Sequence, residues 1–120
     1  MNEETWVFIK TEFYGIHQWK ECEIQEVSFL KFPHRHKVFV EVHINVTKKN
    51  REIEFFILQK QVNDIITKLY GSEQIKNLQN KSMETIASEI KKLLQRKYLQ
   101  NKMIILCSED NENGAYIKCL

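Results

Sequence analysis

The segment FPHRHKVFVEVHINV, residues 32–46, predicts a strand whose buried face begins with two histidines. Side chains alternate between the two faces of a strand, so the even-numbered residues from 34 onward share one face. That face carries His34 and His36, followed by four valines and one isoleucine. The opposite face is mostly polar, with Phe39 as its apolar exception. The pattern predicts a strand over residues 34–47 that turns one apolar face to the core.

Three other segments predict strands, because they are rich in aromatic and β-branched residues or follow a turn signal. They cover residues 5–16, 102–107 and 115–120. Asn113-Gly114, a dipeptide typical of hairpin turns, separates the last two strands. Residues 18–31 show no clean period and predict a long loop. Loops of this length are usually functional or mobile.

Two segments have the helical spacing of apolar residues. The first runs from Leu58 to Leu69, with Gly71 at the position of a C-terminal cap. The second begins after Ser82, a good N-terminal cap, and residues 72–81 before it are predicted to be a polar connector. The element order β-β-α-α-β-β predicts an α+β domain, a four-stranded antiparallel sheet with both helices packed on one face.

Length and composition limit the class of protein. The 120 residues suffice for one core, and we expect a single domain over residues 1–120. With 28% charged residues and a net charge of +2, nothing indicates nucleic-acid binding. No apolar run approaches the roughly 20 residues that span a bilayer, and the acidic start fits no signal peptide. Cys22, Cys107 and Cys119 are odd in number, which argues against a disulfide framework. We therefore expect a cytoplasmic protein with free thiols and no membrane partner.

Three of the four histidines can share one site. The Cβ atoms of His34 and His36 should lie about 6–7 Å apart on one strand face. His17 ends the first strand, which pairs naturally with the second. Three neutral imidazoles with an open fourth position suit a catalytic zinc ion. The alternative is that His34 and His36 are partly buried residues bonded to backbone. The apolar face beyond them favours the metal, because an unpaired imidazole is costly there.

Five motifs of this chain resemble those of the 6-pyruvoyl- and 6-carboxytetrahydropterin synthases, a family with the tunnelling fold or T-fold. The motifs are Phe13-Tyr14-Gly15-Ile16-His17, His34-Arg35-His36, Glu54-Phe55, Ser82-Met83-Glu84 and Ser108-Glu109. They occur in the family's order along nearly the whole chain, and the family has the same element order.

The resemblance implies a T-fold that assembles into an oligomeric barrel, as a homo-oligomer of trimers that stack into hexamers with active sites between subunits. His17, His34 and His36 would be the zinc ligands. Glu109 would anchor a pterin or purine-like small molecule, because two carboxylate oxygens match a guanine-like donor edge. The alternative for Glu109 is a solvated carboxylate beside a hairpin.

The chain lacks the residues with which the family transfers protons. The family's base cysteine, commonly four residues before its H-G-H motif, is Leu30 here. No histidine follows His43, so the family's Asp-His pair is missing. Cys22 lies in the same loop and is our candidate catalytic thiol, although a loop cysteine is more often incidental. The other candidate bases of this loop are Glu21, Glu23 and Glu26.

Two functional classes follow. The first is a zinc-dependent, tetrahydropterin synthase-like lyase that acts on a pterin-like heterocycle. The second is a non-catalytic binder or sequestering protein for a pterin-, guanine- or nucleotide-like ligand. Arg35 and Lys37 favour the second slightly, because cations attract phosphate, but their parity places them on the other strand face. A third possibility is a T-fold protein with neither metal nor ligand.

Overall fold

Two long strands form the centre of the molecule. The structure, a computed structural model, describes residues 2–48 and 50–120. β1 (Thr5–His17) pairs antiparallel with β2 (His34–Val46) along its whole length, from Thr5 opposite Val46 to His17 opposite His34. This register places His17 beside His34 and close to His36, at one end of the sheet.

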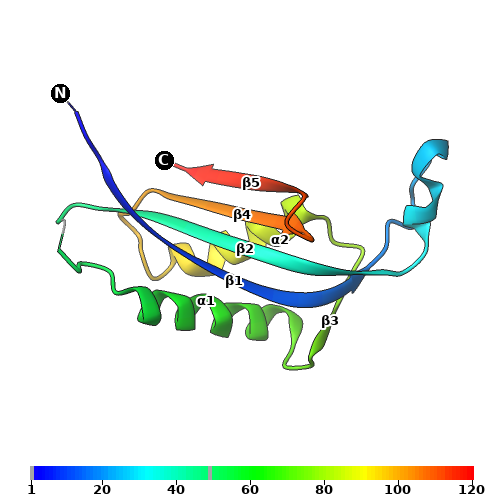
Figure 1. Cartoon of the computed structure of the whole chain (residues 1–120), viewed down its shortest axis with the longest axis horizontal. Coiled ribbons are helices and arrows are strands. Elements are labelled where there is room, and N and C mark those ends of the chain that lie inside the picture. Colours follow the sequence, from blue (N-terminus) through cyan, green and yellow to red (C-terminus); the bar gives the residue numbers. More distant parts are fainter. Residues whose placement is uncertain (1, 49) are drawn as a thin grey trace.

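The other elements complete one layer of strands and one layer of helices. The sheet has the strand order β3-β1-β2-β4-β5, and α1 and α2 lie against one of its faces (Figure 1). The bounds are η1 Gln25–Lys31, α1 Phe55–Tyr70, β3 Ile75–Gln79, α2 Met83–Gln95, β4 Met103–Glu109 and β5 Asn113–Cys119. The predicted α+β class, with both helices on one face, is confirmed.

The core lies between the sheet and the helices. The inward residues of β2, from Val38 to Ile44, are fully buried, as the alternation in the sequence predicts. They pack with inward residues of β4 and with the apolar stripes of both helices. Fully burying each such aliphatic side chain contributes about 1.5–3 kcal/mol. The histidines at the start of β2 therefore lie next to a fully buried apolar face of the sheet.

Within the described residues the sheet has five strands, one more than predicted, because residues 75–79 form a strand and not a connector. β3 runs parallel to β1, with Tyr14 opposite Ile75. Its inward residues are only Lys76 and Leu78, so the segment lacks an apolar period that sequence reasoning can detect. Gly15 permits the contact, since a Cβ at that position would lie 2.3 Å from Cδ1 of Leu78.

The hairpin between β4 and β5 turns three residues earlier than Asn113-Gly114 predicts. Glu109 pairs with Asn113, and the turn consists of residues 110–112. Asp110 and Asn111 have φ values of 55° and 59°, a left-handed conformation that Asp and Asn tolerate. Gly114 belongs to β5 instead, where a Cβ would lie 2.1 Å from the carbonyl oxygen of Cys107. Gly114 therefore allows β4 and β5 to approach each other closely at this point.

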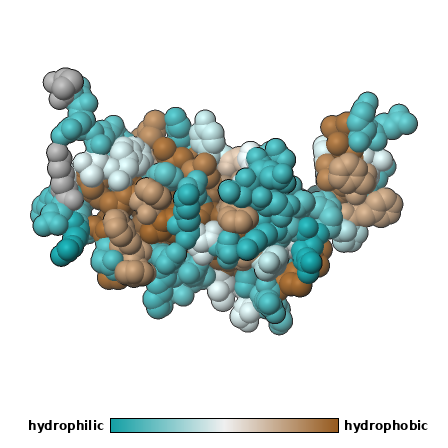
Figure 2. All heavy atoms as spheres, viewed as in Figure 1, coloured by the Kyte–Doolittle hydropathy of each residue, from teal (hydrophilic) through white to brown (hydrophobic). Residues whose placement is uncertain are grey.

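The predicted loop over residues 18–31 contains the short 3₁₀ segment η1 and projects from the body of the molecule (Figure 1). Ile24, Phe29 and Phe32 are exposed on this projection, where hydrophobic and hydrophilic residues are mixed in Figure 2. Within the described residues, no helix is both long enough and apolar enough to cross a membrane.

Candidate metal centre and ligand pocket

The three histidines predicted as metal ligands meet at the end of the sheet. The ring centroids of His17 and His34 are 4.5 Å apart, those of His34 and His36 4.9 Å, and those of His17 and His36 5.4 Å. One ring nitrogen from each residue lies within 4.8 Å of the other two. The alternation along β2 and its register with β1 produce this cluster.

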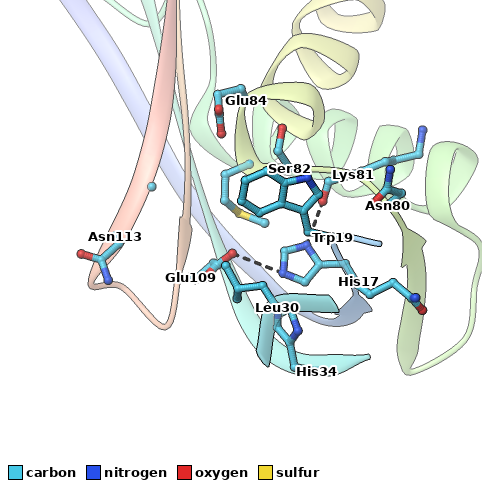
Figure 3. Close-up of a pocket in the computed structure, with 13 residues that line it drawn as sticks. His17, Trp19, Leu30, His34, Asn80, Lys81, Ser82, Glu84, Glu109 and Asn113 are labelled. Atoms are coloured by element: carbon cyan, nitrogen blue, oxygen red, sulfur yellow. Dashed lines mark hydrogen bonds and ion pairs between the residues drawn. The ribbon is translucent and has the colours of Figure 1, made fainter. Parts of the chain in front are cut away.

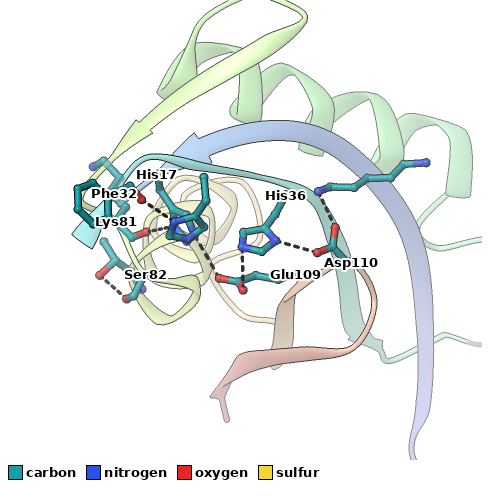
Figure 4. A network of polar contacts seen from close by, with 10 residues as sticks. His17, Phe32, His36, Lys81, Ser82, Glu109 and Asp110 are labelled. Carbon is teal, nitrogen blue, oxygen red and sulfur yellow. Dashed lines mark hydrogen bonds and ion pairs between the residues drawn. The ribbon is translucent and has the colours of Figure 1, made fainter. Parts of the chain in front are cut away.

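Each imidazole is held through its Nδ1 atom, and Figure 4 shows this for His17 and His36. Nδ1 of His17 lies 2.8 Å from the carbonyl oxygen of Lys81, and Nδ1 of His34 lies 2.9 Å from that of Phe32. Nδ1 of His36 lies 2.7 Å from Oδ2 of Asp110. These oxygens accept a hydrogen bond from a protonated Nδ1, so in the neutral imidazole Nε2 would be the nitrogen with a lone pair for a metal ion. Metal-binding histidines are usually fixed in this way.

The Nε2 atom of His17 indicates that a cation fits here. His17 is 9% exposed, and its Nε2 has no hydrogen-bond partner among the described residues. Oε1 of Glu109 lies 3.3 Å away, but not in the direction of a hydrogen bond. Leaving a buried polar atom unpaired costs about 1–3 kcal/mol. An ion coordinated by three imidazole nitrogens, the donor type that zinc prefers, would satisfy it.

Glu109 lies beside the histidine cluster, at the end of β4. Its Oε1 is 3.3 Å from Nε2 of His17, and its Oε2 is 3.3 Å from Nε2 of His36. The contact with Glu109 raises the pKa of His17, although burial opposes this. In return, contact with His17 lowers the pKa of the Glu109 carboxyl. Glu109 is therefore a half-buried carboxylate within ion-pair distance of two imidazoles, and its role as a ligand anchor stays a prediction.

A cavity of about 480 Å³ opens beside this cluster (Figure 3). His17, His34 and Glu109 form part of its wall. The rest comes from the loop after β1, the start of α2 and the start of β5: Gln18, Trp19, Leu30, Asn80, Lys81, Ser82, Met83, Glu84, Asn113 and Gly114. Its size, with apolar and polar walls, is typical of small-molecule sites.

The candidate thiol Cys22 does not line this cavity. Its side chain is 1% exposed, and its Sγ lies 3.7 Å from the carbonyl oxygens of Ile24 and Val27. Leu30, at the position of the family's cysteine, does line the cavity. The catalytic role of Cys22 stays a prediction.

The other residues singled out in the sequence lie away from the cavity. His43 is on the opposite sheet face, as parity predicts, and stacks on Phe8 with ring centroids 5.2 Å apart. Arg35 lies on that face too, over the ring of Tyr14 at 5.8 Å. Cys107 is in the core, where burial raises the pKa of its thiol to about 12.

Sequence reasoning missed residues that hold the imidazoles. Asp110 is a turn residue directly after Glu109, and that position was its only signal. Lys81 acts through its carbonyl group, which every residue has, so nothing in the sequence indicates it. Trp19 stands two residues after His17. It lines the cavity because of the path that the loop takes in the folded chain, which the sequence does not reveal.

Comparison with known proteins defines the fold. No family model and no curated protein matches this sequence. An uncharacterised protein from Wolinella succinogenes is similar in structure, with a TM-score of 0.68 and 12% identity over 98% of this chain and 99% of that one. A 6-pyruvoyltetrahydropterin synthase from Plasmodium vivax has a TM-score of 0.66 and 14% identity over 98% of each chain. The chain thus has the predicted T-fold, and at these identities the likeness extends to the fold alone.

Proposed function

We propose that this protein binds zinc through His17, His34 and His36 and holds a pterin-like heterocycle in the adjacent cavity. The main supporting observation is the geometry of the three imidazoles, each held at Nδ1 and each with a ring nitrogen within 4.8 Å of the other two, beside a cavity of ligand size. The Plasmodium protein of the same fold is by name a pterin synthase. That name supports the choice of heterocycle.

In this proposal Glu109 recognises the heterocycle. Its carboxylate can accept two parallel hydrogen bonds from the ring N–H and amino group of a pterin or guanine edge. Trp19 and Met83 line the same cavity and supply apolar surface for a flat ring. Zinc, when bound, would polarise a substrate oxygen as a Lewis acid.

A lyase-like activity also requires a group that moves protons. Cys22 remains our proposal for a catalytic thiol, although a loop rearrangement would have to expose it. Glu21 is the loop carboxylate for which the structure gives a link to the cavity, since its Oε2 accepts from Nδ2 of Asn80, a cavity residue. The Plasmodium structure is of a variant that lacks a catalytic glutamate, so a carboxylate has a catalytic role in that protein.

The position of Leu30 favours the second candidate function, a non-catalytic binder or sequestering protein for a pterin-, guanine- or nucleotide-like ligand. Leu30 occupies the cavity wall where the family resemblance places the base, and a leucine cannot transfer a proton. The histidine cluster and Glu109 would bind the ion and the heterocycle in either case. The two candidates therefore differ in turnover and share the ligand pocket.

We further propose a homo-oligomer, a trimer or hexamer, in the cytoplasm. Support comes from the two sheet edges, β3 and β5, which are available to pair with other copies. Sedimentation analysis tests this, and a monomer at micromolar concentration would contradict it.

The central experiment is elemental analysis of purified protein, together with mass spectrometry of any small molecule released by denaturation. We expect one zinc per chain and a heterocycle of pterin or purine type. Incubation with reduced pterins then separates the candidates, since an enzyme forms a product that a chelator abolishes and a binder returns the compound unchanged. Protein that takes up neither zinc nor any such heterocycle would refute the proposed function.

A further inference from the structure

A series of hydrogen bonds connects the end of α1 to the imidazole of His17. The hydroxyl of Tyr70 donates to Oε1 of Glu89 at 2.9 Å, and Nζ of Lys81 donates to Oε2 of Glu89 at 2.6 Å. The carbonyl oxygen of Lys81 accepts from Nδ1 of His17 at 2.8 Å. Both carboxylate oxygens of Glu89 are thus used, and Lys81 is bound at both its side chain and its backbone.

This network lies in a partly dry part of the molecule. Tyr70 is buried, and the side chains of Lys81 and Glu89 are 29% and 27% exposed. Burial, followed by the bond to Glu89, raises the pKa of the Tyr70 hydroxyl, which therefore stays a donor at neutral pH. A charge pair in such surroundings is stronger than a surface pair, because the local dielectric is lower.

The bond at Nδ1 of His17 depends on where Lys81 is held. Lys81 is in the short connection between β3 and α2, residues 80–82. Its N–H donates to the carbonyl oxygen of Leu78 at 3.1 Å, which fixes one side of the residue. Its side chain reaches along α2 to Glu89, eight residues later, which fixes the other side. The direction of the Lys81 carbonyl is therefore set by two anchors.

We propose that Glu89, supported by Tyr70, is a positioning residue for the metal centre, and that it acts on His17 through Lys81. Neither Glu89 nor Tyr70 lines the cavity, and both are connected to His17 through Lys81. Their role is to aim the Lys81 carbonyl so that His17 carries its proton on Nδ1 and presents Nε2 to the ion. The inference rests on the metal-binding part of the proposed function.

The first test is the tautomer of His17 in metal-free protein, read from long-range nitrogen–proton NMR spectra. In the wild type we expect the Nδ1–H form to dominate. Glu89→Ala should give a mixture of both forms, and Tyr70→Phe a smaller shift in the same direction. Asp64→Asn is the matched control, because it breaks the exposed pair with Lys60 on α1 and should leave His17 unchanged.

The second test is zinc affinity, measured by competition with a chromophoric chelator. Loss of such a supporting group typically weakens binding 10–100-fold, and we expect about this loss in Glu89→Ala. Lys81→Arg should retain affinity and Lys81→Met should lose it, while Asp64→Asn should bind as the wild type. If Glu89→Ala does not fold, Glu89→Gln and Lys81→Met carry the same test.

A His17 tautomer that is unchanged in Glu89→Ala, Lys81→Met and Tyr70→Phe would overturn the positioning role, as would a wild-type zinc affinity in Glu89→Ala and Lys81→Met. A wild type that binds no zinc would refute the proposed metal site. In that case the tautomer measurement still decides whether Glu89 orients His17.

Discussion

The carboxylate of Asp110 supports the candidate centre at two points. Its Oδ2 lies 2.7 Å from Nδ1 of His36, and its Oδ1 accepts from the backbone N–H of Lys37 at 3.0 Å. The bond from Lys37, followed by that from His36, lowers the pKa of Asp110, so the group is an anion at neutral pH. A carboxylate behind a metal-binding imidazole fixes the ring and makes it a better ligand.

We predict that Asp110→Asn weakens zinc binding about 10–100-fold, because the amide lacks the charge that supports His36. The substitution preserves the backbone, since Asn tolerates the φ of 55° at this position. Chelator competition measures the affinity. Glu12→Gln is the matched control, because it removes a carboxylate charge from the ion pair with Lys37 on the outer face. Equal affinities of Asp110→Asn and wild type would contradict the prediction.

For Glu109 we predict that Glu109→Gln weakens heterocycle binding about 10–100-fold, since hydrogen bonds to a charged group contribute about 1.5–3 kcal/mol. Calorimetry with a pterin or guanine on zinc-loaded protein gives the affinity. Glu112→Gln, in the turn outside the cavity, should bind as the wild type. Should both variants retain full affinity, Glu109 does not recognise the ligand.

The clustering of the three histidines could be predicted from the sequence, because strand parity depends only on local geometry. His34 and His36 share a face for that reason, and pairing of β1 with β2 adds His17. Asp110 and Lys81 could not be predicted as their partners. Their contacts join residues 74 and 64 positions apart, and only the folded chain determines such distances.

At the scale of elements, β3 shows where pattern reasoning reaches its limit. A five-residue edge strand with Leu78 as its one inward apolar residue carries too little periodicity to be distinguished from a connector. Its position depends on a tertiary fit, the absence of a Cβ at Gly15 opposite Leu78. β2 and both helices were predictable because each repeats its apolar pattern several times.

We predict that Gly15→Ala destabilises the protein by about 1–3 kcal/mol, because overpacking a core contact has this typical cost. The added methyl group would meet Cδ1 of Leu78 at 2.3 Å. Urea denaturation measures the free energy of unfolding. In a Leu78→Ala background the cost of Gly15→Ala should largely disappear, since the smaller side chain leaves room. A cost that is the same in both backgrounds would show that the two residues do not press against each other.

For the whole molecule, the fold and the site depend on different parts of the sequence. At 12–14% identity the structural neighbours share the architecture, which alternating apolar residues are enough to specify. The histidines add a cost to this architecture, because they place polar rings at the end of a dry face. The single domain over residues 1–120 and the cytoplasmic location stay predictions.

A bound ion would offset the free-energy cost of these polar rings, so the stability of the whole chain should report on metal binding. We predict that zinc raises the melting temperature, because a ligand that binds only the folded state stabilises it by about 2.7 kcal/mol at 100 times its Kd. For a chain of this length the shift is on the order of 10 °C. Differential scanning calorimetry with zinc and after chelation gives the two temperatures. His34→Ala should melt at the same temperature in both conditions, because the ion then lacks one of its three proposed ligands. If wild type and His34→Ala respond alike to zinc, the ion binds elsewhere and the three imidazoles are not its ligands.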